Sequence, residues 1–183
     1  MNEPQHSRAV IAAPFGTLVL EASDSHLLNI EVKIETSGLP APATPLLLEA
    51  TRQFNAYFDD PLRPFSLPLF KQGTAYQNRV WQALSAIPPR SVKSYGQLAD
   101  ELHSGARAVA SACRANRFPV MIPCHRVVAA HGIGGYCGVG DSTVELNGHS
   151  DMETLHSPVL EVGVGSLLDI KRWLLQHEGY EYP

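Results

Sequence analysis

The sequence of 183 residues lacks any apolar run near the roughly 20 residues that a membrane-spanning helix needs, so no membrane segment is expected. Met1 to His6 show no basic stretch followed by an apolar one, and no signal peptide is expected. Cysteine is scarce: Cys113, Cys124 and Cys137 form no CxxC pair and leave one thiol over in any disulfide scheme. Free thiols suit a reducing compartment, so a cytoplasmic location is expected.

An excess of positive charge is also missing. The net charge is −4, whereas a general nucleic-acid binder is basic. Any contact with DNA must therefore come from a local cluster, and a solvated helix face is the alternative interpretation of such a cluster. One candidate cluster consists of four arginines close together in the sequence: Arg107, Arg114, Arg117 and Arg126.

The first third of the chain predicts a small lobe that mixes strands with one helix. Residues 9–21 are typical of a β-hairpin, and residues 27–32 alternate as a half-buried strand. Residues 46–58 carry an apolar stripe at helical spacing. Residues 61–69 contain three prolines, which exclude a regular helix and indicate a linker or edge segment between two lobes. We place the first lobe at residues 1–70.

The remainder, residues 73–183, predicts a mostly helical lobe. Thr74 is expected to cap one helix, and Ser94 with Gln97 forms a capping-box pattern that opens the next. A turn then leads to a helix over about 106–116, which makes a helix-turn-helix candidate. A last helix is expected over 167–177. The predicted fold class is mixed α/β (α+β): an N-terminal lobe with an antiparallel sheet and helix, and a winged-helix-like C-terminal lobe.

The second helix of this pair has two distinct faces. Arg107, Ser111 and Arg114 are spaced i, i+4 and i+7, hence on one side, with Val109 and Cys113 on the other. Several alanines keep the helix slim, as a helix that enters a nucleic-acid groove closely must be. A small surface helix packed tightly on its neighbour explains the same pattern.

The sequence Pro123-Cys124-His125-Arg126-Val127 carries the strongest chemical signal. A thiolate is a strong nucleophile, and an adjacent imidazole can take its proton. The dipeptide Cys-His alone occurs often by chance, so its weight comes from the surrounding sequence.

With that surrounding sequence, the chain resembles the O6-alkylguanine-DNA alkyltransferases. The resemblance covers Gly73 to Gly179 and is interrupted once. It rests on five blocks in order: Gly73-Thr74-Ala75-Tyr76 with Val80-Trp81-Gln82-Ala83-Leu84; Ser94-Tyr95-Gly96-Gln97-Leu98-Ala99; Ala106-Arg107-Ala108-Val109; Ile122-Pro123-Cys124-His125-Arg126-Val127-Val128; and Lys171-Arg172-Trp173-Leu174-Leu175 with His177-Glu178-Gly179.

The resemblance implies a site built around the cysteine. Cys124 would accept an alkyl group and become a permanent thioether. His125 would act as general base and relay the thiol proton through water to Glu178. Asn116 would orient this network or the surroundings of the cysteine.

The resemblance also implies DNA contacts and a base pocket. Arg107 would fill the space left in the duplex when the damaged nucleotide rotates out, and Tyr95 would help to drive that rotation. Ser111 and Arg114 would contact DNA from the same helix. The pocket would include four residues: Tyr136, Val127, Pro119 and Cys137.

The implied activity is DNA repair by irreversible transfer of an alkyl group from O6-alkylguanine, and from O4-alkylthymine, with one event per molecule. The expected partner is double-stranded DNA bound by a monomer, with no cofactor and no metal. The chemistry is consistent with this, because O6 is buried in the duplex and the base must be flipped out at a cost of a few kcal/mol. A shielded thiol also needs a nearby base, since burial raises its pKa.

One departure from the family is an insertion at about 141–165 that carries His149, Asp151, Glu153 and His156. These four side chains could bind a metal, but a solvated acidic loop is the preferred interpretation. Two rival functions remain open. A non-catalytic, alkyltransferase-like lesion binder would lack the acceptor cysteine that this chain keeps, and a thiol hydrolase would turn over many times.

Overall fold

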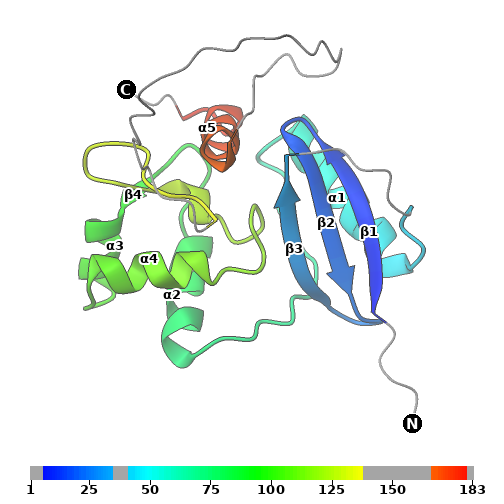
Figure 1. The fold of residues 1–183 in the computed structure, drawn as a ribbon, viewed down its shortest axis with the longest axis horizontal. Helices are drawn as coiled ribbons and strands as arrows, with labels where there is room; N and C mark the ends of the chain where they lie inside the picture. Colours follow the sequence, from blue (N-terminus) through cyan, green and yellow to red (C-terminus); the bar gives the residue numbers. More distant parts are fainter. Residues whose placement is uncertain (1–5, 35–40, 138–165, 181–183) are drawn as a thin grey trace, which may run out of the picture.

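The computed structural model describes residues 6–34, 41–137 and 166–180, in two lobes that lie side by side (Figure 1). The N-terminal lobe, β1 to α1, has a three-stranded antiparallel sheet and one helix. The C-terminal lobe, from α2 onward, is mainly helical. The predicted fold class is confirmed.

The sheet of the N-terminal lobe is a simple meander. Strands β1 (Ser7–Ala13), β2 (Gly16–Ala22) and β3 (Leu27–Lys33) pair antiparallel in chain order. Gly16 opens β2 with a φ of +135°, and a Cβ there would lie 2.4 Å from the backbone oxygen of Lys33. Only glycine fits this close approach, so the predicted hairpin turn depends on it.

Helix α1 (Pro45–Asp59) covers the sheet. Its N-cap is Thr44, whose hydroxyl accepts from the Leu47 N–H at 3.3 Å. The predicted apolar stripe is buried, together with one polar residue: Leu47, Ala50, Gln53, Phe54 and Tyr57. The stripe therefore faces the core, and Tyr57 lies in the last turn of the helix.

The proline-rich segment 61–69 runs toward the edge of the sheet, as predicted. The Leu27 N–H donates to the Pro68 carbonyl at 2.9 Å, and the Phe70 N–H donates to the Leu27 carbonyl at 2.9 Å. These two bonds pair the end of the linker with the start of β3. The chain then passes into the C-terminal lobe.

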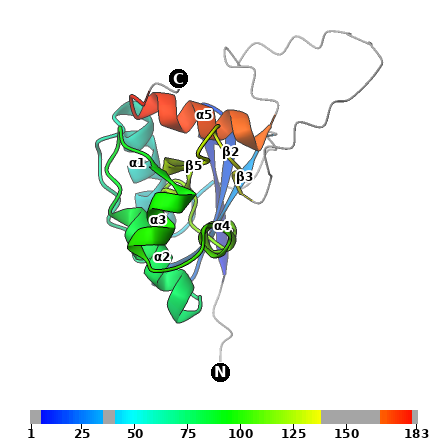
Figure 2. The ribbon, with the colours of Figure 1, turned by 90° about the vertical axis from the view of Figure 1, so that its left-hand side faces the viewer.

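Three helices build most of the C-terminal lobe: α2 (Ala75–Ser85), α3 (Tyr95–Glu101) and α4 (Ala106–Arg114). Both predicted capping interactions are present, at Thr74 and at Ser94. Helices α3 and α4 form the expected helix-turn-helix pair (Figure 2). Helix α4 ends at Arg114, slightly before the predicted end.

The motif segment and the last helix complete the C-terminal lobe. A 3₁₀ turn, η1 (Cys124–Arg126), leads into β5 (Val127–Val128), which pairs parallel to β4 (Lys93–Ser94). Helix α5 (Leu167–His177) packs on η1. It also reaches the N-terminal lobe, since the Trp173 ring lies 5.2 Å from that of Phe15.

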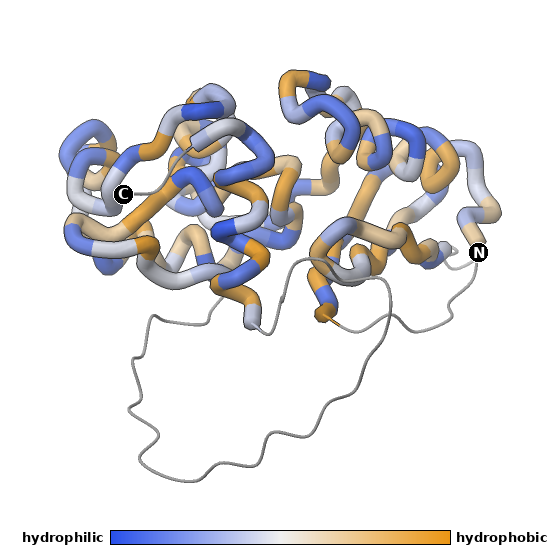
Figure 3. The backbone as a smooth tube through the Cα atoms, turned by 90° about the horizontal axis from the view of Figure 1, so that it is seen from above, coloured by the Kyte–Doolittle hydropathy of each residue, from blue (hydrophilic) through white to orange (hydrophobic). Residues whose placement is uncertain are grey.

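Hydrophobic and hydrophilic stretches alternate along the chain in both lobes (Figure 3). Within the described ranges, no helix combines the length and apolarity required to cross a membrane. The larger of two buried hydrophobic clusters among the described residues runs through both lobes and includes Phe15 and Phe54 as well as Trp81 and Cys124. The lobes therefore share one core.

Candidate active site

Cys124 lies in the core at the first position of η1. Only 5% of the residue is exposed. Pro123 has φ −80° and ψ 66°, an inverse γ-turn in which the Cys124 N–H donates to the Ile122 carbonyl at 2.8 Å. The proline thus turns the chain so that the cysteine begins a new short helix.

Asn116 holds the thiol from the loop that follows α4. Its Nδ2 lies 3.3 Å from Sγ of Cys124 and donates to the Ile122 carbonyl at 2.9 Å. Its Oδ1 accepts from the Phe118 N–H at 2.9 Å. Because both ends of the amide have partners, its orientation is determined. These contacts allow Asn116 to orient the Cys124 thiol.

His125 and Glu178 form a buried pair. Their exposed fractions are 0% and 1%, and Nε2 of His125 lies 2.8 Å from Oε1 of Glu178. Nδ1 of His125 has no hydrogen-bond partner among the described residues. If Nε2 carries the proton donated to the carboxylate, Nδ1 has the lone pair that can take a proton from a thiol.

Arg126 is part of this network, and its predicted membership of a basic DNA-facing cluster is wrong. Its Nε donates to Oε2 of Glu178 at 2.8 Å, and Nη2 donates to Oε1 at 2.9 Å. Nη1 donates to the Ile87 carbonyl. The residue is only 8% exposed because its charge is paired with a buried carboxylate. The other three arginines are exposed: Arg107, Arg114 and Arg117.

Burial and charge set the protonation states of the site. Burial raises the pKa of the Cys124 thiol, and the hydrogen bond from Asn116 and the charge of Lys171 oppose this only in part. Burial lowers the pKa of His125 despite the opposing carboxylate, so the imidazole is neutral at about pH 7. Burial alone would raise the pKa of Glu178, but bonds from His125 and Arg126 outweigh it and hold the pKa at about 2.

These states define what the site can do. The thiol is protonated at rest, the imidazole is a neutral base, and the carboxylate is a fixed anion. Such an arrangement can generate a thiolate when a proton moves to imidazole, and Glu178 stabilises the imidazolium that forms.

Helix α4 has the two faces predicted for it. Arg107, Ser111 and Arg114 are exposed, whereas Val109 and Cys113 are buried. The indole N–H of Trp81 donates to the Ala112 carbonyl at 2.9 Å and ties the buried face to α2. The helix is therefore both packed on its neighbour and free along its arginine-bearing side.

Tyr95, predicted to contact DNA, and the predicted pocket residues lie in different environments. Tyr95 is half-buried at the start of α3 and donates to the Gly135 carbonyl at 3.4 Å. Tyr136 is buried, and its hydroxyl has no partner among the described residues. Of the other three predicted pocket residues, Val127 and Pro119 are buried and Cys137 is exposed.

Lys171 joins segments that follow the cysteine motif, although no role was predicted for it. The residue is fully buried in α5. Its Nζ donates to the carbonyls of Val127 and Ile133 at 2.7 Å and of Gly135 at 2.9 Å. It thereby links β5 to the glycine-rich loop. Its position on the apolar stripe of α5 was the sequence signal that could have indicated a buried, hydrogen-bonded lysine.

Tyr57 also belongs to the hydrogen-bond network around Glu178, although the sequence did not predict this role. It lay on the apolar stripe of α1, which indicated burial. Its hydroxyl donates to Oε1 of Glu178 at 2.8 Å across 121 positions of sequence. No local pattern relates two residues that far apart.

A separate cavity of about 650 Å³ lies where the two lobes meet. Tyr57 and Arg126 are among its lining residues, together with prolines of the linker and of the turn after α2. Its lining contains neither Cys124 nor any of the predicted pocket residues, so this cavity is distinct from the predicted base pocket. The insertion at 141–165, with its four candidate metal ligands, lies outside the described residues.

Comparisons with known proteins show which proteins the chain is similar to. Residues 75–155 match the family model "6-O-methylguanine DNA methyltransferase, DNA binding domain". The chain is 37% identical over 134 residues to a methylated-DNA--protein-cysteine methyltransferase of Mycobacterium leprae, covering 69% of this chain and 81% of the relative. It is 42% identical over 136 residues to a constitutive methylated-DNA--protein-cysteine methyltransferase of Bacillus subtilis, covering 68% and 82%. A structure of Mycobacterium tuberculosis OGT in complex with DNA superposes with a TM-score of 0.68 at 33% identity, covering 93% and 91%.

Proposed function

The chain belongs to the methylated-DNA--protein-cysteine methyltransferase family, and from that premise we propose that it repairs DNA by moving the alkyl group of O6-alkylguanine onto Cys124. O4-alkylthymine is the second proposed substrate. The reaction consumes the protein, since a thioether does not revert. We place it in the cytoplasm, acting as a monomer on double-stranded DNA.

The observation that carries the proposal is the arrangement of the buried residues Cys124, His125 and Glu178, with the half-buried Asn116 beside the thiol. The thiol proton passes to Nδ1 of His125, through a water or directly, because Nε2 is committed to Glu178. The thiolate attacks the alkyl carbon, an S–C bond forms, and the bond from that carbon to O6 breaks. The guanine takes up one proton as its keto form is restored, which balances the proton lost by the thiol.

The remaining site residues support a role for residues 73–183 as the DNA-binding and alkyl-acceptor domain, with residues 1–70 as the N-terminal lobe. Arg107 fills the gap left by the rotated nucleotide, and Ser111 and Arg114 contact the backbone from the same exposed face of α4. Tyr95 assists the rotation. The pocket walls are Tyr136, Val127, Pro119 and Cys137.

Intact mass spectrometry tests the proposal directly. After incubation with an oligonucleotide that contains O6-methylguanine, the protein should gain a single methyl group on Cys124 and react no further. Cys124→Ser should remain unmodified, and Cys113→Ser should react as the wild type does, because Cys113 lies on the buried face of α4. Unmodified wild-type protein after long incubation would contradict the proposal. Repeated turnover would favour the thiol hydrolase.

Arg107→Ala separates DNA recognition from chemistry. The side chain is exposed on α4, so its removal should weaken reaction with duplex DNA by about tenfold or more, a cost of roughly 1–3 kcal/mol. Reaction with free O6-benzylguanine, which needs no nucleotide rotation, should be unchanged. The matched control is Arg52→Ala, an exposed arginine on α1 of the other lobe. Equal losses on both substrates would remove the proposed role of Arg107.

A further inference from the structure

We propose that Tyr57 of the N-terminal lobe is a positioning residue for alkyl transfer, and that it acts by holding the carboxylate of Glu178 against His125. The inference rests on the proposed function and goes beyond it, because it assigns part of the support of the reaction centre to the lobe that does not carry the cysteine. Tyr57 does not contact the reacting atoms and acts only through Glu178.

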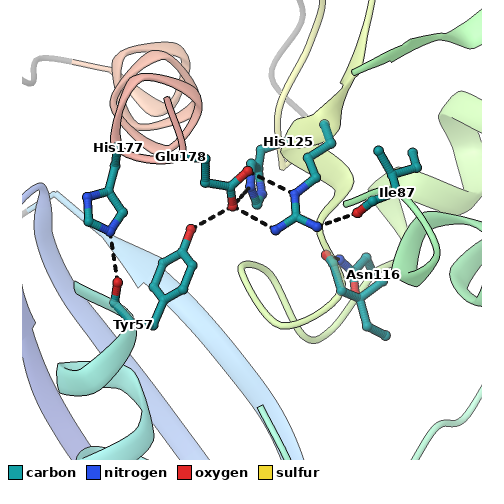
Figure 4. A network of polar contacts seen from close by, with 8 residues as sticks. Tyr57, Ile87, Asn116, His125, His177 and Glu178 are labelled. Carbon is teal, nitrogen blue, oxygen red and sulfur yellow. Dashed lines mark hydrogen bonds and ion pairs between the residues drawn. The ribbon is translucent and has the colours of Figure 1, made fainter. Parts of the chain in front are cut away.

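The contact is buried and short. The Tyr57 hydroxyl donates to Oε1 of Glu178 at 2.8 Å, and the tyrosine is 2% exposed. Figure 4 shows the carboxylate between the tyrosine on one side and the imidazole of His125 on the other. Oε1 is the same oxygen that contacts Nε2 of His125, so a shift of that oxygen changes the imidazole contact directly.

Tyr57 is itself held firmly in place. Its ring packs against those of Phe58, Phe65 and His177, with centroid distances of 5.8, 5.4 and 5.4 Å. Its backbone carbonyl lies 2.8 Å from Nε2 of His177, the residue before Glu178. Both the side chain and the backbone of Tyr57 therefore contact the end of α5.

Glu178 needs this support because of where it lies. It follows the last residue of α5, where the carbonyl end of the helix disfavours a negative charge. Donors from two lobes offset this: Tyr57 from α1, and His125 and Arg126 from η1. Burial and the adjacent carboxylate raise the pKa of Tyr57, so its hydroxyl remains a donor and does not compete with His125 as a base.

Tyr57→Phe isolates the hydroxyl, because phenylalanine keeps the ring packing. In the full chain, the rate of Cys124 alkylation by free O6-benzylguanine, measured on the plateau of the pH–rate profile, should fall about two- to tenfold. This corresponds to the loss of one buried hydrogen bond. The acid limb of the rate profile should move to lower pH, since a carboxylate that is no longer held against His125 stabilises the imidazolium less. The other ionisable groups around Glu178, namely Arg126 from η1 and Lys171 and His177 from α5, are the same in both proteins.

Two controls distinguish this role from a structural one. Tyr76→Phe removes a hydroxyl that lies 2.7 Å from Oγ of Ser104, away from the network, and should leave rate and profile unchanged. In a Glu178→Gln background, Tyr57→Phe should no longer shift the acid limb, because its effect passes through the carboxylate. An unchanged plateau and acid limb in Tyr57→Phe, or an equal shift in both backgrounds, would overturn the inference. A wild-type protein that is not alkylated would overturn the proposed function instead.

Discussion

Replacing His125 with glutamine should lower the rate of Cys124 alkylation at about pH 7 by 10²- to 10⁴-fold, the usual contribution of a general base. Glutamine can still donate a hydrogen bond toward Glu178, but it has no basic nitrogen. The thiol is then left with its raised pKa and no neighbouring acceptor for its proton. This is the largest effect on activity that we expect from a variant that keeps the cysteine.

The dependence on pH should change in kind as well. In the wild type, the rate should rise with pH as His125 loses its proton and then level off. This rise should be complete below about pH 6.5, the ordinary histidine pKa, because burial lowers the pKa of His125. In His125→Gln, the rate should follow the thiolate fraction and rise about tenfold per pH unit through the neutral range.

The measurement is alkylation by O6-benzylguanine, followed by intact mass over a range of pH. The matched control is His26→Gln, in the turn between β2 and β3, which should match the wild type. A flat profile for His125→Gln through neutral pH would show that another group takes the thiol proton. Thermal unfolding of each variant checks that the comparison is made between folded proteins.

Replacing Arg126 with methionine should reduce the free energy of unfolding by about 3–5 kcal/mol, the cost of leaving one member of a buried ion pair without its partner. Glu178 would lose both bonds that the guanidinium donates, and the Ile87 carbonyl would lose its donor. Methionine has a similar length, so the change removes charge and hydrogen bonds more than volume. We expect this to be the largest effect on stability among the variants considered.

Urea unfolding compares this variant with two others. Arg172→Met breaks an exposed i,i+3 pair with Asp169 and should cost less than about 1 kcal/mol. Adding Glu178→Gln to Arg126→Met should recover part of the loss, because the buried charge is then gone as well. A cost for Arg126→Met as small as that of the surface control would mean that the buried pair contributes little to the fold.

Much of the fold follows from patterns within short stretches of sequence. The capping boxes at Thr74 and Ser94, the stripe of α1 and the two faces of α4 all depend on residues three or four apart. Such spacing determines which side chains meet on one helix, whatever the rest of the chain does. The motif around Cys124 likewise points to the candidate nucleophile and its neighbouring imidazole, because residue type, adjacency and the matching blocks around them can all be read along the chain.

The surroundings of that motif required the tertiary structure. Arg126 follows His125 directly and was grouped with the exposed arginines, because sequence spacing does not reveal which side of a turn a side chain takes. The structure turns it inward to the carboxylate of Glu178. Lys171 was visible on an apolar stripe, but the carbonyls of Val127, Ile133 and Gly135 that it binds lie more than 35 positions away along the chain.

The sequence alone thus determined the helices, the family resemblance and the nucleophile, because these depend on local spacing and on residue type. Only the tertiary structure decided how Glu178 is held, by Tyr57 from one lobe and by His125 and Arg126 from the other. The physical reason is that contacts across 121 and 53 positions arise from how α1, η1 and α5 pack together. No periodicity within any one of these elements encodes that packing.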